Sequence, residues 1–142
     1  MKKLTRLIPL LLAVLLLLTA CGKDKDDSAD NNGVPLPAEG ETLQLGEGSK
    51  EFAFKITFTD GKTASYSIKT DEETVGEALQ ALGLIDGEEG PYGLYVTTVG
   101  GETVKYEDGG HFWSFYINGE YANTGVDVTE AENGASYAFI VS

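Results

Sequence analysis

Two stretches of the chain, separated by Asp60-Gly61, alternate between apolar and polar positions with the period of a half-buried strand. Between residues 51 and 58 the large apolar side chains fall on every second residue from Phe52 to Phe58, and between residues 63 and 69 they fall on Ala64, Tyr66 and Ile68. An Asp-Gly pair at this point is typical of a hairpin turn. The pattern predicts an antiparallel hairpin with one apolar face.

The apolar spacing then changes to that of a helix. Val75, Leu79 and Leu82 lie on one helical face. Thr74 and Glu77 have the spacing of a capping box, and Gly83 is typical of a helix C-terminus. These features predict one short helix over about residues 75–82 that packs across the hairpin.

The rest of the chain is predicted to be mostly strands. Residues 84–93, rich in glycine and acids, are expected to form a loop, followed by a strand at 94–99, a Gly100-Gly101 turn and a return strand at 102–106. An aromatic strand at 112–117 turns at Asn118-Gly119 and resumes at 120–121, and a final strand at 136–142 is expected between neighbours. The fold class predicted is α+β, a β-grasp-like mixed sheet with one short helix packed on one face.

The N-terminus has the pattern of a bacterial lipoprotein signal. A basic start (residues 1–6) precedes an apolar run at 7–20, and Leu18-Thr19-Ala20-Cys21 resembles a lipobox. We expect residues 1–20 to be a signal peptide and Cys21 to be lipidated, which would tether the protein to the extracytoplasmic face of the cell membrane. The alternative is an uncleaved anchor followed by an ordinary buried cysteine.

Residues 21–48 contain few large apolar groups and many acids, so we expect a disordered tether there, with the folded domain at 49–142. The formal net charge of the chain is −13. Such a charge argues against nucleic acid or an anionic membrane surface as the partner, because both would repel it. Simple solubility, a cationic ligand and divalent ions all remain compatible.

Chemistry is sparse in this sequence. His111 is the only histidine and Cys21 the only cysteine, so a metal site at His111 would need the carboxylates of Glu107 or Asp108. The acids Asp86, Glu88 and Glu89 could hold calcium weakly, although a solvated loop is the simpler interpretation. No nucleophile–base pair or phosphate loop is present, so we expect neither an enzyme nor a bound cofactor.

Four segments carry a resemblance to a known family. They are Thr74-Val-Gly-Glu-Ala-Leu, Tyr95-Val-Thr-Thr-Val-Gly-Gly, Trp113-Ser-Phe-Tyr-Ile-Asn-Gly-Glu-Tyr-Ala-Asn-Thr-Gly-Val and Glu132-Asn-Gly-Ala-Ser-Tyr-Ala-Phe. Together they resemble the transcobalamin-like C-terminal domain family. This is a bacterial domain of unknown function, grouped with the soluble-ligand-binding β-grasp domains and similar to the small domain that caps cobalamin in transcobalamin and intrinsic factor.

The resemblance implies a set of ligand-binding residues on the aromatic strand and the loop after the second turn: Trp113, Ser114, Phe115, Asn123, Thr124 and Gly125. It implies a corrinoid as a possible ligand. The helical barrel that supplies most corrin contacts in the cobalamin carriers is missing from this chain, so a separate helical partner domain is a further expectation.

From the residues alone, Trp113, Phe115 and Ile117 share one face of the aromatic strand and Phe112, Ser114 and Tyr116 the other. One face must be core, and a ring near the 122–125 turn could be exposed enough for a flat ligand to stack on it. Tyr92, Tyr95, Tyr106 and Tyr121 could enlarge such a surface.

The first functional hypothesis is therefore a tethered extracellular module that binds a corrinoid or another planar small molecule. The alternatives are a cell-surface module that binds protein or glycan, and a weak divalent-metal-binding domain.

Overall fold

The computed structural model describes residues 29–30 and 34–142 of the chain. The predicted signal peptide and Cys21 lie outside these residues. In the described part, no helix has both the length and the apolar character needed to cross a membrane. The elements are β1 (Ala29–Asp30), β2 (Val34–Pro35), β3 (Thr42–Gly46), β4 (Lys50–Thr57), β5 (Thr63–Thr70), α2 (Val75–Ala81), β6 (Ile85–Gly90), β7 (Gly93–Val99), β8 (Glu102–Thr103), the 3₁₀ helix η3 (Tyr106–Asp108), β9 (Trp113–Ile117), β10 (Glu120–Tyr121), the 3₁₀ helix η4 (Val126–Val128) and β11 (Ser136–Val141).

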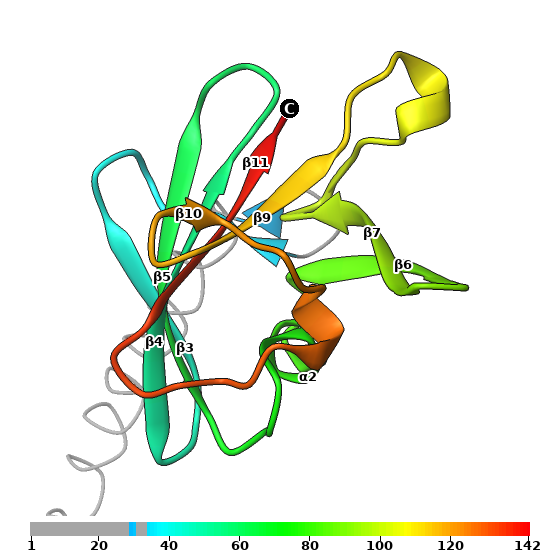
Figure 1. The fold of residues 1–142 in the computed structure, drawn as a ribbon. Helices are drawn as coiled ribbons and strands as arrows, with labels where there is room; N and C mark the ends of the chain where they lie inside the picture. Colours follow the sequence, from blue (N-terminus) through cyan, green and yellow to red (C-terminus); the bar gives the residue numbers. More distant parts are fainter. Residues whose placement is uncertain (1–28, 31–33) are drawn as a thin grey trace, which may run out of the picture.

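Six strands form the main sheet, in the order β10-β9-β11-β4-β5-β3 (Figure 1). β11 runs parallel to β4 and β3 runs parallel to β5, whereas β4–β5, β9–β11 and β9–β10 are antiparallel pairs. β11, which comes last in the sequence, thus lies beside β4 of the first hairpin, although α2 and the second sheet lie between them in the sequence. This mixed sheet with one α-helix among the described residues confirms the predicted α+β, β-grasp-like fold class.

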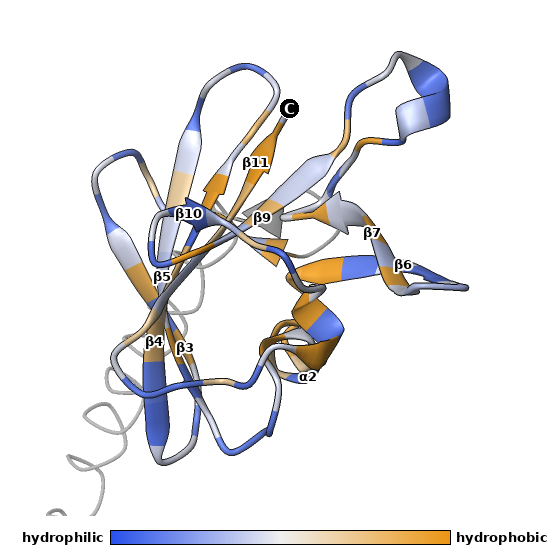
Figure 2. Cartoon of the chain, viewed as in Figure 1, coloured by the Kyte–Doolittle hydropathy of each residue, from blue (hydrophilic) through white to orange (hydrophobic). Residues whose placement is uncertain are grey.

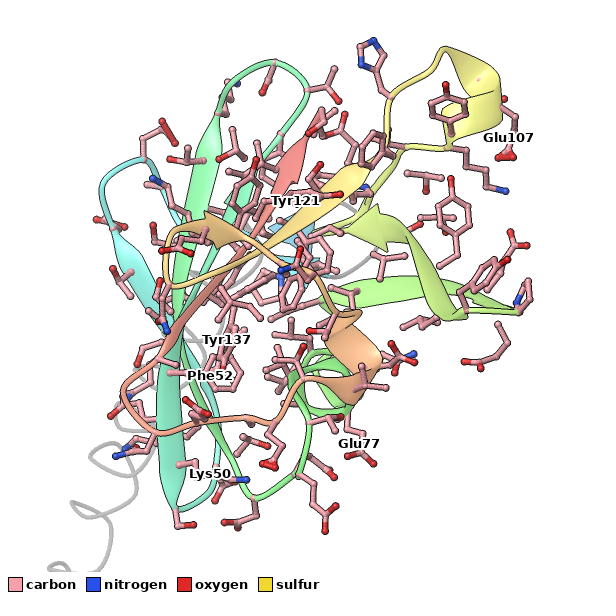
Figure 3. The ribbon with its side chains drawn as sticks, viewed as in Figure 1. Lys50, Phe52, Glu77, Glu107, Tyr121 and Tyr137 are labelled. Atoms are coloured by element: carbon pink, nitrogen blue, oxygen red, sulfur yellow. The ribbon has the colours of Figure 1, made fainter. Side chains whose placement is uncertain are left out.

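Helix α2 begins at the predicted cap. Thr74 Oγ1 accepts a hydrogen bond from the Glu77 amide at 3.1 Å, and Glu77 Oε1 accepts one from the Thr74 amide at 3.2 Å, which completes a capping box. Val75, Ala78 and Leu79 are buried, whereas Glu77 points outward to solvent (Figure 3). The helix therefore buries the apolar face that its sequence predicts.

The core lies between the main sheet and a second layer made by α2, η4 and the small sheet. Phe52, Phe54 and Ile56 of β4 are almost completely buried, as the alternation predicts. The rings of Phe52 and Tyr137 meet edge to face, with centroids 5.0 Å apart (Figure 3). Figure 2 shows hydrophobic residues on α2, on the start of β6 and on the strands of the main sheet, and hydrophilic residues in the loops and in η3.

The second sheet has three strands in the order β6-β7-β8. The prediction of a loop over 84–93 is wrong for its first part, because β6 pairs with β7 in antiparallel register. The register shifts between Asp86 and Gly87, where a Cβ on Gly87 would lie 2.1 Å from the carbonyl oxygen of Tyr95. Only glycine fits at this bulge. The return strand is shorter than predicted, since it ends at Thr103 and is followed by η3.

The sheet also reaches further towards the N-terminus than expected. Residues 42–46 were predicted to belong to a disordered tether, but they form β3 and pair with β5. Val34 is buried, and the Tyr66 hydroxyl donates a hydrogen bond to the Pro35 carbonyl at 2.8 Å. The folded unit thus begins before the boundary predicted at residue 49. The part of the predicted tether before residue 29, and residues 31–33, lie outside the described residues.

Candidate functional site

A cavity of about 210 Å³ lies between β7, β9 and the segment that links β10 to η4. Five of the six residues implied by the family resemblance line it: Trp113, Ser114, Phe115, Thr124 and Gly125. Asn123, the sixth, is exposed and is not part of the lining. The other lining residues are Leu94, Tyr95, Val96, Phe112, Tyr121, Ala122, Val126 and Phe139.

The alternation of β9 decides which of its side chains face the core. Trp113 and Phe115 are 6% and 8% exposed and belong to the core, whereas the Ser114 hydroxyl forms a hydrogen bond with the Ser142 hydroxyl. One face of the aromatic strand is therefore core, as expected. Because Trp113 is buried, its ring does not offer an open face on which a flat ligand could stack.

The indole of Trp113 has one unusual property. Its Nε1–H is buried and has no hydrogen-bond partner among the described residues. The ring meets Phe58 edge to face, with centroids 6.2 Å apart, so the packing around it is apolar. A buried donor without an acceptor costs about 1–3 kcal/mol, and such groups in native proteins are rare enough to need an explanation.

The segment from Ala122 to Thr129 is held in place by several hydrogen bonds. The Ala122 amide donates to the Phe115 carbonyl at 2.9 Å, and Thr129 Oγ1 donates to the Gly125 carbonyl at 2.7 Å. The hydroxyls of Thr124 and Thr129 are 3.2 Å apart. The wall that carries Thr124 and Gly125 is consequently fixed to β9 on one side and to the end of η4 on the other.

Asp127 supports this wall from outside the lining, and the sequence offered no signal for it. Its Oδ2 accepts a hydrogen bond from the Leu94 amide at 3.2 Å, which joins η4 to β7. Two glycines make room for the carboxylate: a Cβ on Gly93 would lie 2.9 Å from Oδ2, and a Cβ on Gly125 would lie 2.7 Å from Oδ1. A Cβ at position 125 would therefore require the Asp127 carboxylate to move.

The exposed rings at this end of the molecule are tyrosines. Tyr95 and Tyr121 line the cavity and are 38% and 60% exposed, and Figure 3 shows Tyr121 next to β9. Tyr106 packs near Phe112, with centroids 6.4 Å apart, and its amide donates to the Tyr95 hydroxyl at 3.1 Å. Tyr92 is fully exposed and does not line the cavity. The open aromatic surface is therefore formed by Tyr95, Tyr106 and Tyr121 rather than by Trp113.

The side chain behind the cavity is neutral. Tyr137 stacks on Phe115, with centroids 6.1 Å apart and an angle of 11° between the rings. Burial raises the pKa of the Tyr137 hydroxyl, which keeps it protonated. The residue that packs on Phe115 is therefore aromatic and uncharged.

The residues considered for a metal site do not converge. Across residues 29–30 and 34–142 the structure has no group of three or more His, Cys, Asp or Glu side chains arranged to hold an ion. Glu88 faces Lys105 at 3.5 Å, Asp86 accepts a hydrogen bond from the Gly87 amide, and His111 Nδ1 lies 3.0 Å from the Ser142 carbonyl.

The family model described as a domain of unknown function, DUF4430, matches residues 72–139. A crystal structure of a "putative metal binding protein" from Ruminococcus gnavus is 30% identical to this chain, with a TM-score of 0.63, and the alignment covers 66% of this chain and 97% of that one. The chain belongs to the DUF4430 family. The matched segment includes β9, β10 and η4, so the cavity lies within the DUF4430 domain.

A second solved structure, haptocorrin in complex with Cbi, is 16% identical with a TM-score of 0.49. The alignment covers 66% of this DUF4430 chain but only 25% of haptocorrin. No curated protein matches the sequence.

Proposed function

We propose that this DUF4430 protein is a membrane-tethered extracellular binding module for a corrinoid or another planar small molecule. The observation that carries the proposal is the arrangement around Trp113. Five residues of the implied binding set, Trp113 among them, line one cavity, and the exposed tyrosines Tyr95 and Tyr121 line it as well. An apolar concavity with a few polar groups is the usual form of a small-molecule site.

The size of the cavity limits how a ligand can bind. Sites for drug-sized ligands usually enclose about 300–1,000 Å³, and this one encloses about 210 Å³. A corrin ring is too large to enter it. The planar part of the ligand would therefore lie across Tyr95 and Tyr121, and one peripheral group would enter the cavity.

The tether in this proposal rests on the N-terminal sequence. The apolar run at 7–20 and the lipobox-like Leu18 to Cys21 support a lipid anchor on Cys21 and a location on the extracytoplasmic face of the cell membrane. The proposal assigns no catalytic residue, no cofactor chemistry and no nucleic-acid partner. It allows a separate helical domain to cover the ligand from the other side.

The test is a titration of the protein with cobalamin and with cobinamide, followed by calorimetry and by Trp113 fluorescence corrected for inner-filter absorption. Tyr121→Ala should weaken binding, because Tyr121 lines the cavity, and Tyr92→Ala should not, because Tyr92 is even more exposed but lies outside the lining. Equal effects of the two substitutions would refute this placement of the ligand. Absence of binding at millimolar ligand, with the chain folded, would refute the corrinoid as a ligand of the chain alone.

A surface-interaction module is the second candidate, and β10 is the observation in its favour. β10 is an edge strand of the main sheet, and both of its residues, Glu120 and Tyr121, are exposed. An exposed edge can pair with a strand of another protein. Tyr121→Pro removes the backbone amide that faces away from β9 and should weaken partner binding in that case, whereas Tyr121→Ala, which keeps that amide, should weaken it much less.

A divalent-metal-binding domain is the third candidate, because the 30%-identical relative carries that description. A ligand that binds only the folded state raises the unfolding temperature in proportion to the logarithm of its concentration. Calcium and zinc should therefore each be tested by thermal unfolding, with EDTA as the control. No shift at millimolar ion would refute this candidate.

A further inference from the structure

A second, larger groove lies at the end of the main sheet where β4 turns into β5. It encloses about 700 Å³ and is formed by three segments that are far apart in the sequence: residues 36–39, the turn at 58–64, and Gly101-Glu102. In Figure 1 the turn between β4 and β5 and the segment that precedes β3 stand at the same end of the sheet. The groove shares no lining residue with the cavity at Trp113.

The floor of this groove is apolar. Leu36, Pro37, Phe58 and Ala64 contribute to it, and Phe58 is only half-buried. The Phe58 ring stands on the edge of the Trp113 indole, so it is supported from behind and presents aromatic surface to the groove. An apolar floor of this kind favours a ligand with a hydrophobic body.

The walls carry three carboxylates, one from each segment. Glu39 Oε2 accepts hydrogen bonds from the Thr63 amide at 2.9 Å and from its hydroxyl at 3.0 Å. Glu102 Oε1 accepts one from the Thr59 amide at 3.3 Å. These bonds fix the position of both carboxylates and use only one oxygen of each.

The third carboxylate, Asp60, accepts a hydrogen bond from the Lys62 amide at 2.9 Å. Lys62 is the one basic residue of the lining, and its Nζ is 4.0 Å from Asp60 Oδ2 with 76% of the side chain exposed. An ion pair so long and exposed neutralises little. The lining therefore keeps an excess of negative charge over an apolar, partly aromatic floor.

We propose that this groove binds an organic cation with a hydrophobic body, of the arylalkylamine class. The ammonium group would lie between the carboxylates of Glu39 and Glu102, and the ring would lie on Phe58 and Leu36. Charge complementarity excludes an anionic ligand, and the apolar floor favours an organic cation over a bare metal ion. An aromatic face next to the ammonium adds a cation–π attraction.

The experiment uses the full chain and three probes that share one ring: phenethylamine, phenethyl alcohol and phenylacetate. Binding is followed by amide chemical shifts of Thr59, Thr63 and Gly101 in a ¹⁵N-labelled sample. Phenethylamine should move these signals saturably, and the neutral and anionic probes should bind more weakly in that order. Raising the ionic strength should weaken phenethylamine binding, because exposed charges are screened.

Two substitutions test the role of the carboxylates. Glu39→Gln and Glu102→Gln remove the negative charge but keep a carbonyl oxygen that can accept the hydrogen bonds of Thr63 and Thr59. Each should weaken phenethylamine binding by about two- to fivefold, the range expected for one partly exposed ion pair. Glu107→Gln is the matched control, since Glu107 lies in η3 outside the groove (Figure 3).

Three results would overturn the proposal. If phenethyl alcohol bound as tightly as phenethylamine, the positive charge would contribute nothing to binding. If Glu107→Gln weakened phenethylamine binding as much as Glu39→Gln and Glu102→Gln do, the amine would be attracted by the overall negative charge of the protein and not by the groove. Saturable shifts at Leu94 and Ala122 without shifts at Thr59 and Thr63 would place the amine in the cavity at Trp113 instead.

Discussion

The Tyr137 hydroxyl connects the main sheet to the segment that leads from η4 into β11. It donates a hydrogen bond to the Glu130 carbonyl at 3.0 Å and accepts one from the Glu132 amide at 3.2 Å. The Tyr137 ring is fully buried against Phe52 and Phe115. In Tyr137→Phe the ring can keep these contacts, while the Glu130 carbonyl and the Glu132 amide lose their partner.

We expect Tyr137→Phe to lower the free energy of unfolding by about 1–3 kcal/mol, the usual cost of leaving buried polar groups unpaired. For a domain of this size, each kcal/mol lowers Tm by about 4 °C. Urea unfolding followed by circular dichroism measures the change, and the slope m should stay the same because the surface exposed on unfolding is unchanged. Amide hydrogen exchange should also accelerate at Glu132.

Tyr116→Phe is the matched control. Tyr116 lies in the neighbouring strand β9, and its hydroxyl forms no hydrogen bond with the residues that the structure describes. This substitution should change stability by less than about 0.5 kcal/mol, because it keeps the ring and removes no hydrogen bond. If Tyr137→Phe were equally mild, the two hydrogen bonds would contribute nothing net, and the segment after η4 would be held by its other contacts alone.

Three further changes test the helix, the N-terminal contact and the η4 packing. Thr74→Ala removes the helix cap and should cost about 1 kcal/mol in urea unfolding; no loss would mean that the capping box is not needed. Burial raises the pKa of Tyr66 to about 12, whereas the value expected in the unfolded chain is about 10. The folded state therefore stays protonated to higher pH than the unfolded state, and stability should fall as pH rises from 10 to 12. Tyr66→Phe should make unfolding less sensitive to pH in that window, and an unchanged dependence would assign the loss to other groups. Gly76→Ala should destabilise although alanine favours helices, because its Cβ would lie 2.8 Å from Asp127 Cα; a gain in Tm would show that η4 moves freely.

The parts of the fold predicted from the sequence are those whose pattern is local. β4 and β5 follow from strict alternation, and α2 follows from the spacing of its apolar residues and the Thr74 cap. β6 was missed because its sequence, Ile-Asp-Gly-Glu-Glu-Gly, has little strand propensity. It forms because Gly87 admits the Tyr95 carbonyl at the bulge, which is a tertiary contact.

β3 was missed for a related reason. It lies at the edge of the sheet and buries Leu43 and Leu45 only in part, so its apolar signal is weak among polar neighbours. At the candidate site, five of the six residues that the resemblance named line one cavity and Asn123 does not, and the burial of Trp113 depends on what packs over β9. Asp127 had no motif at all, since its role depends on the position of β7, which only the folded chain provides.

The place of β11 in the sheet has a consequence for the order in which the chain can fold. β11 lies between β9 and β4, and it pairs residues 136–140 with residues 53–57 in parallel. Contacts between such distant parts of a chain form slowly, because a long loop must close before they are gained. The hairpin and the helix can form early, but both flanking strands remain unpaired on one side until β11 arrives. A ribosome or translocation channel that still held the last strand would keep the sheet open, and removal of β11 would leave two separate edges rather than a smaller stable domain.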